Sequence, residues 1–388
     1  MKSKAVVIVG TGFAGMVAAR NILKTLPDDC HVVLIGRYSN FIFKPLLHEV
    51  ATGCFGSGVI RESVQSVHNY PRFNAVIGKV VAVDLERQFV VAGRRRVSYD
   101  FLIFATGSET NFFNISGAER YSFKLETLND AISLRHAVAS LPRSRVSSVV
   151  VIGGGPTGVE MAAELSEFRR DLGIPFSITV LDRSHILLPM MRERFRSIVA
   201  RFFGKSGIRL LLNTGVVRIG KSFVVTDKKV RIPSDITVWC AGVKPVSVSL
   251  FPKLDLPKGF FPVDEFLHLN GFSNVFAVGD CAFVQNVDGS PVPMLAQSAV
   301  AEGRTAALNV LASVRGSPLR KFVFRNKGII LTLGKGYAVA DVMGFVFSGF
   351  PAWLLNRLVY LGNMFAWRHR FYAARRFSGT LFQKRARN

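Results

Sequence analysis

The residues from 148 to 165 contain the pattern that most constrains the fold of this chain. A run of β-branched residues, Val149 to Ile152, is typical of a strand that is buried on both faces. Gly153, Gly155 and Gly158 follow it with the spacing G-x-G-x-x-G and lead into a helix. The first glycine permits a tight turn, the second lets a pyrophosphate approach the backbone, and the third lets helix and strand pack closely. The segment therefore predicts a dinucleotide-binding strand, turn and helix.

The chain opens with a second copy of this pattern. Residues 5–9 are an apolar run, and Gly10, Gly12 and Gly15 repeat the glycine spacing before a helix expected to reach residue 26. Two copies in one chain indicate two dinucleotides bound face to face, one a flavin and the other a nicotinamide. The predicted fold is therefore α/β, with two Rossmann-like dinucleotide-binding domains for FAD and NADH.

The two copies differ at the end of their second strand. In the later copy the strand 177–181 is followed by Asp182. An acid at this position accepts hydrogen bonds from the ribose hydroxyls of NAD and repels the extra phosphate of NADP. The following Arg183 weakens this preference. In the first copy the strand 31–35 is followed by Gly36 and Arg37, so the acid expected for the adenosine ribose is missing. Arg37, water or the backbone would then take its place.

Length, charge and cysteine usage narrow the class of protein. A chain of 388 residues is too long for one ordinary core, so two or three domains are expected. The formal charge is +24, and residues 315–388 carry fourteen Lys and Arg against one acid. The four cysteines form no C-x-x-C pair and no zinc spacing, which predicts buried small side chains, no metal site and no dithiol redox centre. The first strand begins within four residues of the N-terminus, without an apolar signal segment, so we expect a reducing compartment.

The basic tail from residue 326 to 388 predicts association with a membrane surface. Gly349, Pro351 and Gly362 interrupt a stretch that is otherwise long enough for a transmembrane helix. A helix beginning at Pro351 would have a wide apolar face with basic residues interspersed and following, formed by Trp353, Leu354, Arg357, Leu358, Leu361, Phe365 and Arg368. Trp353, Trp367 and Tyr372 suit the membrane interface, and the basic residues Arg368, Arg370, Arg375, Arg376, Lys384, Arg385 and Arg387 suit anionic headgroups. A dimer-forming apolar tail is a compatible alternative, and a transmembrane span is a third; nucleic-acid binding is disfavoured because the charges are interleaved with apolar residues.

Several segments carry a family resemblance. They are PLLHEVATG at residues 45–53, ATGS at 105–108, NFF at 111–113, AVGDC at 277–281 and AWLLNR at 352–357. In this order, and nearly end to end, they resemble the type II NADH dehydrogenases. These are single-subunit, FAD-containing NADH:quinone oxidoreductases with the two-dinucleotide-domain disulfide-reductase fold. The resemblance implies bound FAD, NADH as donor, a membrane quinone as acceptor and docking by a C-terminal amphipathic region.

The resemblance also implies roles for individual residues. Asp280 would contact FAD between its ribityl and phosphate groups, although capping the following helix is an alternative. Glu160 would lie close to the reacting rings, unless it only benefits from the helix dipole. Gln297 would border the quinone pocket, but Ala301 stands where the family pattern A-Q-x-A-x-Q has its second glutamine. Glu160 and Gln297 are the predicted catalytic residues.

The predicted cofactor contacts are spread over both domains. Those for FAD and the acceptor are Gly10, Gly12, Phe13, Ala14, Gly15, Arg37, Lys44, Pro45, Thr52, Gly53, Ala105, Thr106, Gly107, Asp280, Ala296 and Gln297. Those for NADH are Gly153, Gly155, Pro156, Thr157, Gly158, Glu160, Asp182, Ala241 and Gly242.

The predicted domains are 1–116 for the first part of the FAD-binding domain, 117–244 for the NADH-binding domain, 245–325 for the rest of the FAD-binding domain, and 326–388 for the membrane-associated region. The predicted activity is transfer of two electrons from NADH through FAD to a membrane quinone without proton pumping. We expect a peripheral homodimer on the cytoplasmic face of the cell membrane.

One alternative function is that of a sulfide:quinone oxidoreductase, which needs redox cysteines near the flavin, yet no cysteine follows Cys281. Another is a non-catalytic FAD-binding, redox-sensing protein.

Overall fold

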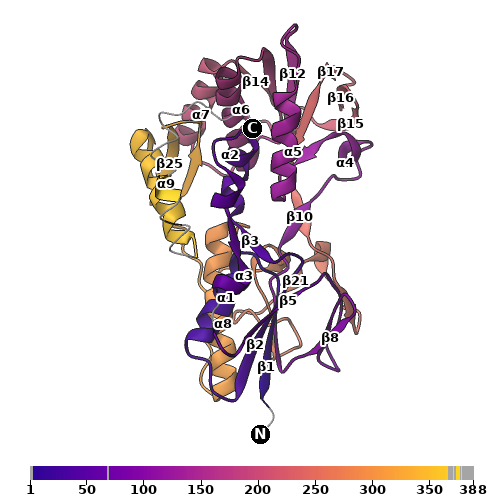
Figure 1. The fold of residues 1–388 in the computed structure, drawn as a ribbon, viewed down its shortest axis with the longest axis vertical. Coiled ribbons are helices and arrows are strands. Elements are labelled where there is room, and N and C mark those ends of the chain that lie inside the picture. The colour runs from indigo at the N-terminus through magenta and orange to yellow at the C-terminus, as the bar shows by residue number, and fades with distance from the viewer. Residues whose placement is uncertain (1–2, 68–69, 366–369, 371–372, 376, 378–388) are drawn as a thin grey trace. The chain divides into compact units, whose positions relative to one another are not determined.

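The computed structural model describes residues 3–67, 70–365, 370, 373–375 and 377, and Figure 1 shows its fold. Its contacts divide the chain into two compact units. Unit 1 comprises Met1–Phe41, Glu62–Glu109 and Val243–Asn326, and unit 2 comprises Ile42–Arg61, Thr110–Gly242 and Lys327–Asn388. The expected tail residues Trp367, Arg368, Tyr372 and Arg376, and the basic residues at 384–387, lie outside the described residues.

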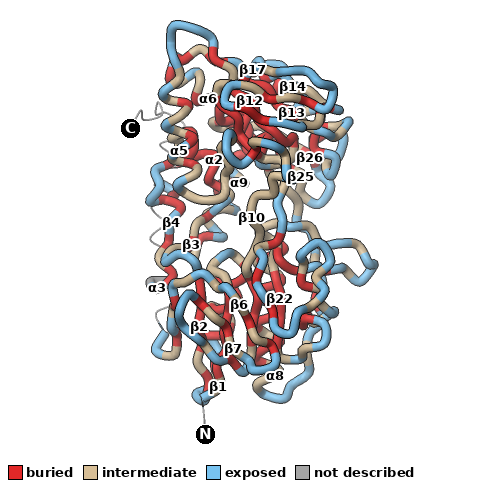
Figure 2. Tube along the Cα trace, turned by 90° about the vertical axis from the view of Figure 1, so that its right-hand side faces the viewer, coloured by how far each residue is buried: buried red, intermediate tan, exposed pale blue. Residues whose placement is uncertain are grey.

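Unit 1 is built on a five-stranded parallel sheet. In spatial order its strands are β22 (Val275–Ala277), β9 (Phe101–Phe104), β1 (Lys4–Val9), β2 (Cys30–Gly36) and β5 (Phe73–Ile77). The apolar residues of β1, Ala5 to Val9, are buried, and Figure 2 colours the buried residues of the chain red. Helix α1 (Phe13–Lys24) packs against α8 (Ala296–Arg315). A sequence with apolar residues on both faces of its central strand requires cover on both sides of the sheet.

Helix α8 begins and ends close to where the sequence predicts. The sequence predicts a helix that opens at about Pro293 and reaches about Leu311. Helix α8 instead begins at Ala296, continues to Arg315 and ends where Gly316 adopts a φ of 67°. Gly316 is the kind of left-handed cap that stops a helix. The other elements of unit 1 are α3 (Val64–Val67), β6 (Val80–Asp84), β7 (Phe89–Ala92), β8 (Arg95–Ser98), β20 (Ser249–Phe251), η3 (Pro257–Gly259), β21 (Phe261–Pro262), η4 (Gly279–Cys281) and β23 (Ala282–Phe283).

Unit 2 repeats the same arrangement. Its parallel sheet has the spatial order β11 (Phe123–Lys124), β18 (Ile236–Trp239), β12 (Ser147–Ile152), β13 (Phe176–Leu181) and β14 (Ile208–Leu211). In both sheets the glycine turn follows the middle strand, the next strand of the pattern lies on one side, and a later strand lies on the other. The predicted α/β class with two parallel sheets is confirmed.

The helices of unit 2 follow the sequence patterns. The sequence predicts a helix at about residues 129–140, and the structure has α5 (Leu128–Ala139) there, whose first turn is held by a capping box between Thr127 and Asp130. The amphipathic segment 190–203 forms α7 (Glu193–Lys205). The remaining elements are η1 (Lys44–Leu46), α2 (Leu47–Ala51), η2 (Ser57–Val59), α4 (Ala118–Tyr121), α6 (Pro156–Leu172), β15 (Val216–Gly220), β16 (Phe223–Thr226) and β17 (Arg231–Pro233). Short ladders are formed by β3 (Asn40–Ile42) with β4 (Arg61–Ser63), and by β10 (Ser108–Thr110) with β19 (Val243–Pro245).

The described part of the tail forms a small sheet covered by one helix. Strands β24 (Ile329–Thr332), β25 (Ala338–Val342) and β26 (Phe345–Gly349) are antiparallel, and α9 (Phe350–Asn363) packs on them, as Figure 1 shows in orange and yellow. One expectation was wrong here. Trp353 is only 3% exposed and Arg357 only 4%, so neither belongs to an outward face. Both lie on the inner side of α9, because Arg357 pairs with a buried acid of α2.

The units differ from the expected domains at several boundaries. Residues Ile42–Arg61 and residues 110–116, expected in the FAD-binding domain, belong to unit 2, and so do the described residues from Lys327 onward. Helix α2 packs against α5 and α6, and strands β24 and β25 of the tail contact α6 and α7, which joins both segments to unit 2. The buried ion pair between Glu49 of α2 and Arg357 of α9 links the two segments to each other. Among the described residues, no helix is both long enough and apolar enough to cross a bilayer.

Candidate functional site

Each glycine turn leaves the end of a helix open to a ligand. Helix α1 begins after Gly12 and α6 after Gly155, and within the described chain neither helix end has a side-chain cap or an acid in its first turn. A Cβ added at Gly12 or Gly155 would meet nothing within 4 Å. Unpaired N–H groups and the helix dipole favour an anion at such an end. Both turns therefore fit the pyrophosphate of a dinucleotide.

In unit 1 the glycine turn lies against a second predicted segment. Gly10 has a φ of 122°, and a Cβ there would lie 1.9 Å from the carbonyl oxygen of Ala105. The turn Ala105-Thr106-Gly107, which follows β9, is thus adjacent to the glycine turn that follows β1. Because the carboxyl ends of adjacent parallel strands form the ligand-binding edge of such sheets, this placement suits a bound cofactor.

Asp280 lies at the same edge, in η4 after β22. Its Oδ2 accepts a hydrogen bond of 2.6 Å from the Ser108 hydroxyl. The neighbouring Gly279 N–H donates to Glu302 Oε2 of α8 at 2.6 Å. Burial, and secondarily the Asp280 charge, raises the pKa of Glu302 to about 8 despite this hydrogen bond. Unit 1 therefore places the oriented carboxylate of Asp280 beside the carboxyl group of Glu302, which tends to remain protonated.

The missing acid of the first copy has a structural explanation. A Cβ at Gly36 would lie 2.3 Å from Cγ2 of Thr11, so a side chain at position 36 has no space. The next residue, Arg37, is exposed at the end of β2. The predicted role of Arg37 at the ribose is compatible with this position.

Gln297 and Ala296 occupy the first turn of α8 in unit 1. Gln297 Nε2 donates to Asn326 Oδ1 at 3.0 Å. This hydrogen bond to the last residue of unit 1 orients the side-chain amide of Gln297. Further along α8, a Cβ at Gly303 would lie 2.3 Å from the carbonyl oxygen of Ala14. The close packing of α8 on α1 therefore requires glycine at 303. Ala301 is half-buried on the same helix.

In unit 2, Asp182 lies where the sequence predicts, at the end of β13 beside the glycine turn. Its Oδ2 accepts from the N–H of Gly154 at 2.5 Å, and its Oδ1 accepts from the N–H of Ser184 at 2.6 Å. These bonds orient the carboxylate and leave further lone pairs for ribose hydroxyls. Arg183 beside it is exposed.

The crossover after β18 packs against the NFF segment. The Asn111 N–H donates to the carbonyl oxygen of Gly242 at 3.0 Å, and Trp239 Nε1 donates to the carbonyl oxygen of Asn111 at 2.9 Å. Ala241 and Gly242 are thereby held at the carboxyl edge of the unit 2 sheet. Burial raises the pKa of the neighbouring Cys240 thiol to about 12, which makes it a poor nucleophile.

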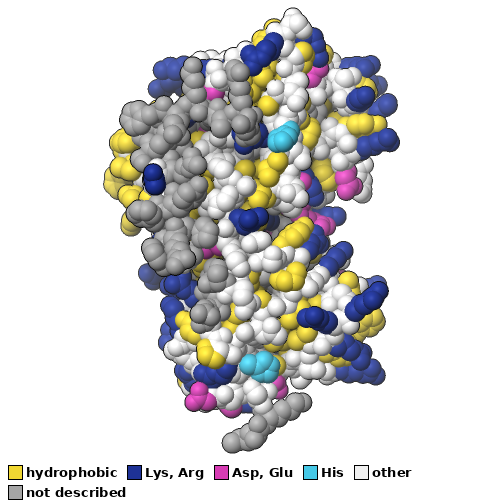
Figure 3. All heavy atoms as spheres, in the orientation of Figure 1, with side chains coloured by type: hydrophobic (Ala, Val, Ile, Leu, Met, Phe, Trp, Pro, Cys, Tyr) yellow, Lys and Arg dark blue, Asp and Glu magenta, His cyan; other side chains and the backbone are white. Residues whose placement is uncertain are grey.

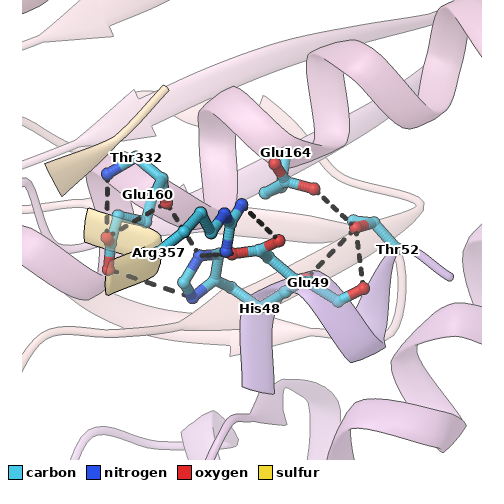
Figure 4. A network of polar contacts seen from close by, with 7 residues as sticks. All are labelled: His48, Glu49, Thr52, Glu160, Glu164, Thr332 and Arg357. Atoms are coloured by element: carbon cyan, nitrogen blue, oxygen red, sulfur yellow. Dashed lines mark hydrogen bonds and ion pairs between the residues drawn. The ribbon is translucent and has the colours of Figure 1, made fainter. Parts of the chain in front are cut away.

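Glu160, the predicted residue near the reacting rings, belongs to a buried polar cluster in unit 2 (Figure 4). Its Oε1 accepts from the Thr332 N–H at 3.0 Å, and its Oε2 lies 3.9 Å from His48 Nδ1. Burial raises the pKa of Glu160, although His48 opposes this shift. Figure 4 also shows Glu49 paired with Arg357, and the Thr52 hydroxyl donating to Glu164 Oε2 at 2.8 Å.

Several predicted flavin residues thus lie in unit 2. Lys44 and Pro45 form η1, and Lys44 is exposed. The Thr52 hydroxyl contacts Glu164, and Gly53, with a φ of 72°, faces the guanidinium of Arg135. Their role at the flavin stays a prediction.

Residues 45–53 were expected along the flavin as a whole, but sequence reasoning did not predict the contacts of several residues that the structure brings to these sites. They are Thr11, Ser108, Gly154, His48, Glu49, Thr332, Arg357 and Glu302. His48 and Glu49 lie within the PLLHEVATG segment, so their charged pair inside an apolar run was a usable signal. Arg357 carried no such signal, because its partner is 308 residues away in the sequence.

Comparison with known proteins agrees with this geometry. The chain is 29% identical to the type II NADH:quinone oxidoreductase Ndh of Mycobacterium tuberculosis, over 98% of this chain and 91% of that protein. Its fold is similar to that of NDH2 from Plasmodium falciparum in complex with NADH, with a TM-score of 0.89, 21% identity and full coverage of both chains. It is also similar to the sulfide:quinone oxidoreductase of Aquifex aeolicus, with a TM-score of 0.82, 18% identity and coverage of 98% and 93%.

The first of these relatives confirms the predicted resemblance to the type II NADH dehydrogenases. The family profile described as pyridine nucleotide-disulphide oxidoreductase matches residues 4–303, which include both glycine turns, Asp182, Asp280 and Gln297. This chain belongs to the pyridine nucleotide-disulphide oxidoreductase family.

Proposed function

We propose that this protein is an FAD-dependent NADH:quinone oxidoreductase that passes two electrons from NADH to a quinone without pumping protons. The observation that carries the proposal is the duplicated nucleotide cradle, one in each unit, each with an uncapped helix end beside an open glycine. The similarity to the type II enzyme of M. tuberculosis over nearly the whole chain supports quinone as the acceptor class.

In this proposal the two units have separate tasks. Unit 1 holds FAD through the turn from Gly10 to Gly15, residues 105–107 and Asp280, whose carboxylate is oriented by Ser108. Unit 2 holds NADH through Gly153 to Gly158, with Asp182 accepting from the ribose hydroxyls. FAD, when bound, supplies the two-electron chemistry, and the protein supplies binding, orientation and exclusion of water.

The test is anaerobic stopped-flow absorbance on FAD-loaded protein. NADH should bleach the flavin, and a short-chain quinone should then restore its absorbance. Bleaching without recovery would indicate another acceptor, and no bleaching with bound FAD would favour a non-catalytic redox-sensing role. Gln297→Ala should slow only the recovery if Gln297 borders the acceptor site.

A sulfide:quinone oxidoreductase is the rival on the same fold. It would require reactive thiols, but burial raises the pKa of Cys281 as well as that of Cys240. Bleaching by sulfide in place of NADH would establish this rival and overturn our proposal.

We also propose that α9 docks the enzyme on the cytoplasmic face of the cell membrane. Phe350, Leu354 and Leu358 lie on successive turns of α9 and are 50%, 44% and 57% exposed. Figure 3 shows hydrophobic side chains at the surface where α9 lies in Figure 1, and many Lys and Arg side chains around the molecule. A lipid surface would bury these apolar groups and attract the positive net charge of +24. Burial of the same face in a homodimer is the alternative, and vesicle binding by a monomeric species would separate the two.

A further inference from the structure

The carboxyl group of Glu302 joins helix α8 to the short turn that carries Asp280. Its Oε2 accepts from the Gly279 N–H at 2.6 Å, and Glu302 is only 3% exposed. Gly279 and Asp280 are consecutive residues of η4, and the Asp280 carboxylate accepts from the Ser108 hydroxyl at 2.6 Å. Glu302 therefore holds the backbone of η4, while Ser108 orients the carboxylate of Asp280.

The same turn lies against the first turn of α1. Gly279 has a φ of 73°, and a Cβ added there would lie 3.3 Å from the Cβ of Ala14. Gly303, the residue after Glu302, also packs on Ala14, because its added Cβ would lie 2.3 Å from the Ala14 carbonyl oxygen. Helix α1 is the helix whose uncapped end fits the FAD pyrophosphate. Glu302 is therefore part of the packing that supports the FAD cradle of unit 1.

An ionised Glu302 would have no countercharge in this packing. Burial, and secondarily the Asp280 charge, raises the pKa of Glu302 to about 8, although the Gly279 N–H lowers it. Within the described chain, Glu302 forms no ion pair with a Lys, Arg or His. A buried carboxylate without such a partner is unfavourable, so the group holds its proton at neutral pH.

The elements packed against Glu302 bring few other titratable groups. Helix α8 contacts α1 and η4, and η4 also contacts β19. In η4, the Cys281 thiol is neutral because burial raises its pKa. In β19, Lys244 lies 3.5 Å from Glu109, its ion-pair partner. The remaining charged residues of the two helices are Arg20, Lys24, Arg304 and Arg315.

FAD brings further negative charge to this edge of the sheet through its pyrophosphate. With Glu302 protonated, the bound cofactor meets the Asp280 carboxylate alone. With Glu302 ionised, it meets a second negative charge in a buried region, where repulsion is stronger than in water. By linkage, a ligand that favours the protonated form binds with full affinity below the pH at which the free protein loses that proton. The affinity then falls as the pH rises further.

We propose that Glu302 is a positioning residue of the FAD site and that its proton is linked to the cofactor, so that the protein binds FAD while this carboxyl group is protonated and releases FAD as the group ionises. Each release in alkaline solution transfers one proton from Glu302 to solvent and no electrons. The inference rests on the proposed function in taking FAD as the ligand of unit 1. It involves neither NADH nor quinone.

The first test measures FAD release from the FAD-loaded full chain. The protein is diluted at pH values from about 6 to about 9.5, and the fluorescence of free flavin gives the Kd for FAD. In the wild type, Kd should be constant up to about pH 7 and should rise above about pH 8, by up to about tenfold per pH unit for one linked proton. Circular dichroism restricts the comparison to pH values at which the chain is folded. A constant Kd over this range overturns the proposal, whether or not any variant folds.

The second test assigns the effect to Glu302. Glu302→Gln retains an acceptor for the Gly279 N–H but cannot ionise, so its Kd should match the wild type at neutral pH and stay there in alkaline solution. Glu302→Met leaves that N–H unpaired and should raise Kd at every pH by about tenfold or more. Glu265→Gln, which replaces an exposed acid of unit 1 paired with Lys321, is the matched control and should retain the wild-type profile.

Two outcomes of these variants would overturn the proposal. Alkaline release of FAD from Glu302→Gln at the wild-type pH would refute the linked proton. An unchanged Kd in Glu302→Met would refute the positioning role. The rescue of affinity by glutamine, without rescue of the pH profile, is the result that distinguishes the linked proton from a purely structural contact.

Stopped-flow at about pH 6.5 separates this inference from the proposed function. Bleaching by NADH and recovery with quinone, combined with a Kd for FAD that does not depend on pH, would overturn the inference alone. Alkaline release of FAD from the wild type but not from Glu302→Gln, in a protein that no quinone reoxidises, would support the inference and refute the proposed function alone.

Discussion

The carbonyl oxygen of Gly153 occupies the position where a side chain at Gly158 would begin, because a Cβ added to Gly158 would lie 1.8 Å from it. Unit 1 has the same relationship, with 1.9 Å between the Gly10 oxygen and a Cβ at Gly15. Two atoms that are not bonded to each other do not approach so closely. The third glycine of each motif is therefore required by contact between helix and turn, independently of any nucleotide.

This contact predicts a selective loss of NADH binding. We expect Gly158→Ala to displace α6 from its turn and to weaken NADH binding more than about tenfold, or about 1.4 kcal/mol, while FAD remains bound. Calorimetric titration with NADH and the flavin absorbance measure the two effects. Gly204→Ala is the control, because Gly204 is exposed on α7 with nothing within 4 Å of its added Cβ. Equal NADH affinity in Gly158→Ala and the wild type would contradict the proposed site.

Asp182 should determine the choice between NADH and NADPH. Asp182→Asn removes the charge that repels a 2′-phosphate, and the exposed Arg183 next to it can then pair with that phosphate. We expect kcat/KM for NADH to fall by about 10- to 100-fold, the equivalent of a lost charge-assisted hydrogen bond, and kcat/KM for NADPH to rise. Asp227→Asn, an acid of the same unit that accepts from the Gly215 N–H at 3.0 Å, should leave both values unchanged. An unaltered preference would place the ribose elsewhere.

Glu302 should make the stability of the protein depend on pH. Burial raises its pKa from 4.5 to about 8, so between these values the native state keeps a proton that the unfolded state has lost. The free energy of unfolding should therefore decrease as pH rises from 5 to 8, with a contribution from Glu302 of up to about 4 kcal/mol.

Glu302→Gln should abolish that contribution while still accepting from the Gly279 N–H. Chemical denaturation of the FAD-loaded protein at pH 5 and pH 8 measures it, with Glu265→Gln, an exposed acid of unit 1, as the control. The same decrease in stability in the wild type and in Glu302→Gln would show that Glu302 is not the group responsible.

The outward face of α9 should govern membrane binding without affecting the chemistry. Leu354→Glu/Leu358→Glu replaces two exposed apolar side chains with acids, which should reduce binding to anionic vesicles by at least about tenfold, because burial of an apolar side chain contributes on the order of 1 kcal/mol or more. Cosedimentation with phosphatidylglycerol vesicles measures binding, and a water-soluble quinone measures activity. Val217→Glu/Val230→Glu is the matched control, since both valines are at least 50% exposed on unit 2. Unchanged vesicle binding would exclude α9 as the docking surface.

The sequence by itself determined the two nucleotide cradles and the parallel sheets that carry them. These features are local: a β-branched run, three glycines at fixed spacing and an acid after the next strand lie within about 35 residues of one another. The same holds for the capping box of α5, which Thr127 and Asp130 form three residues apart.

Only the tertiary structure decided which face of α9 is buried and which residues surround Glu160. The pattern of the tail was compatible with Trp353 and Arg357 on a lipid-facing side, yet the structure turns both inward. The reason is that Arg357 meets Glu49, and Thr332 meets Glu160, across 308 and 172 residues of sequence. Periodicity reports that a helix has two faces, but the partner of a buried charge is set by packing between segments that are distant in the chain.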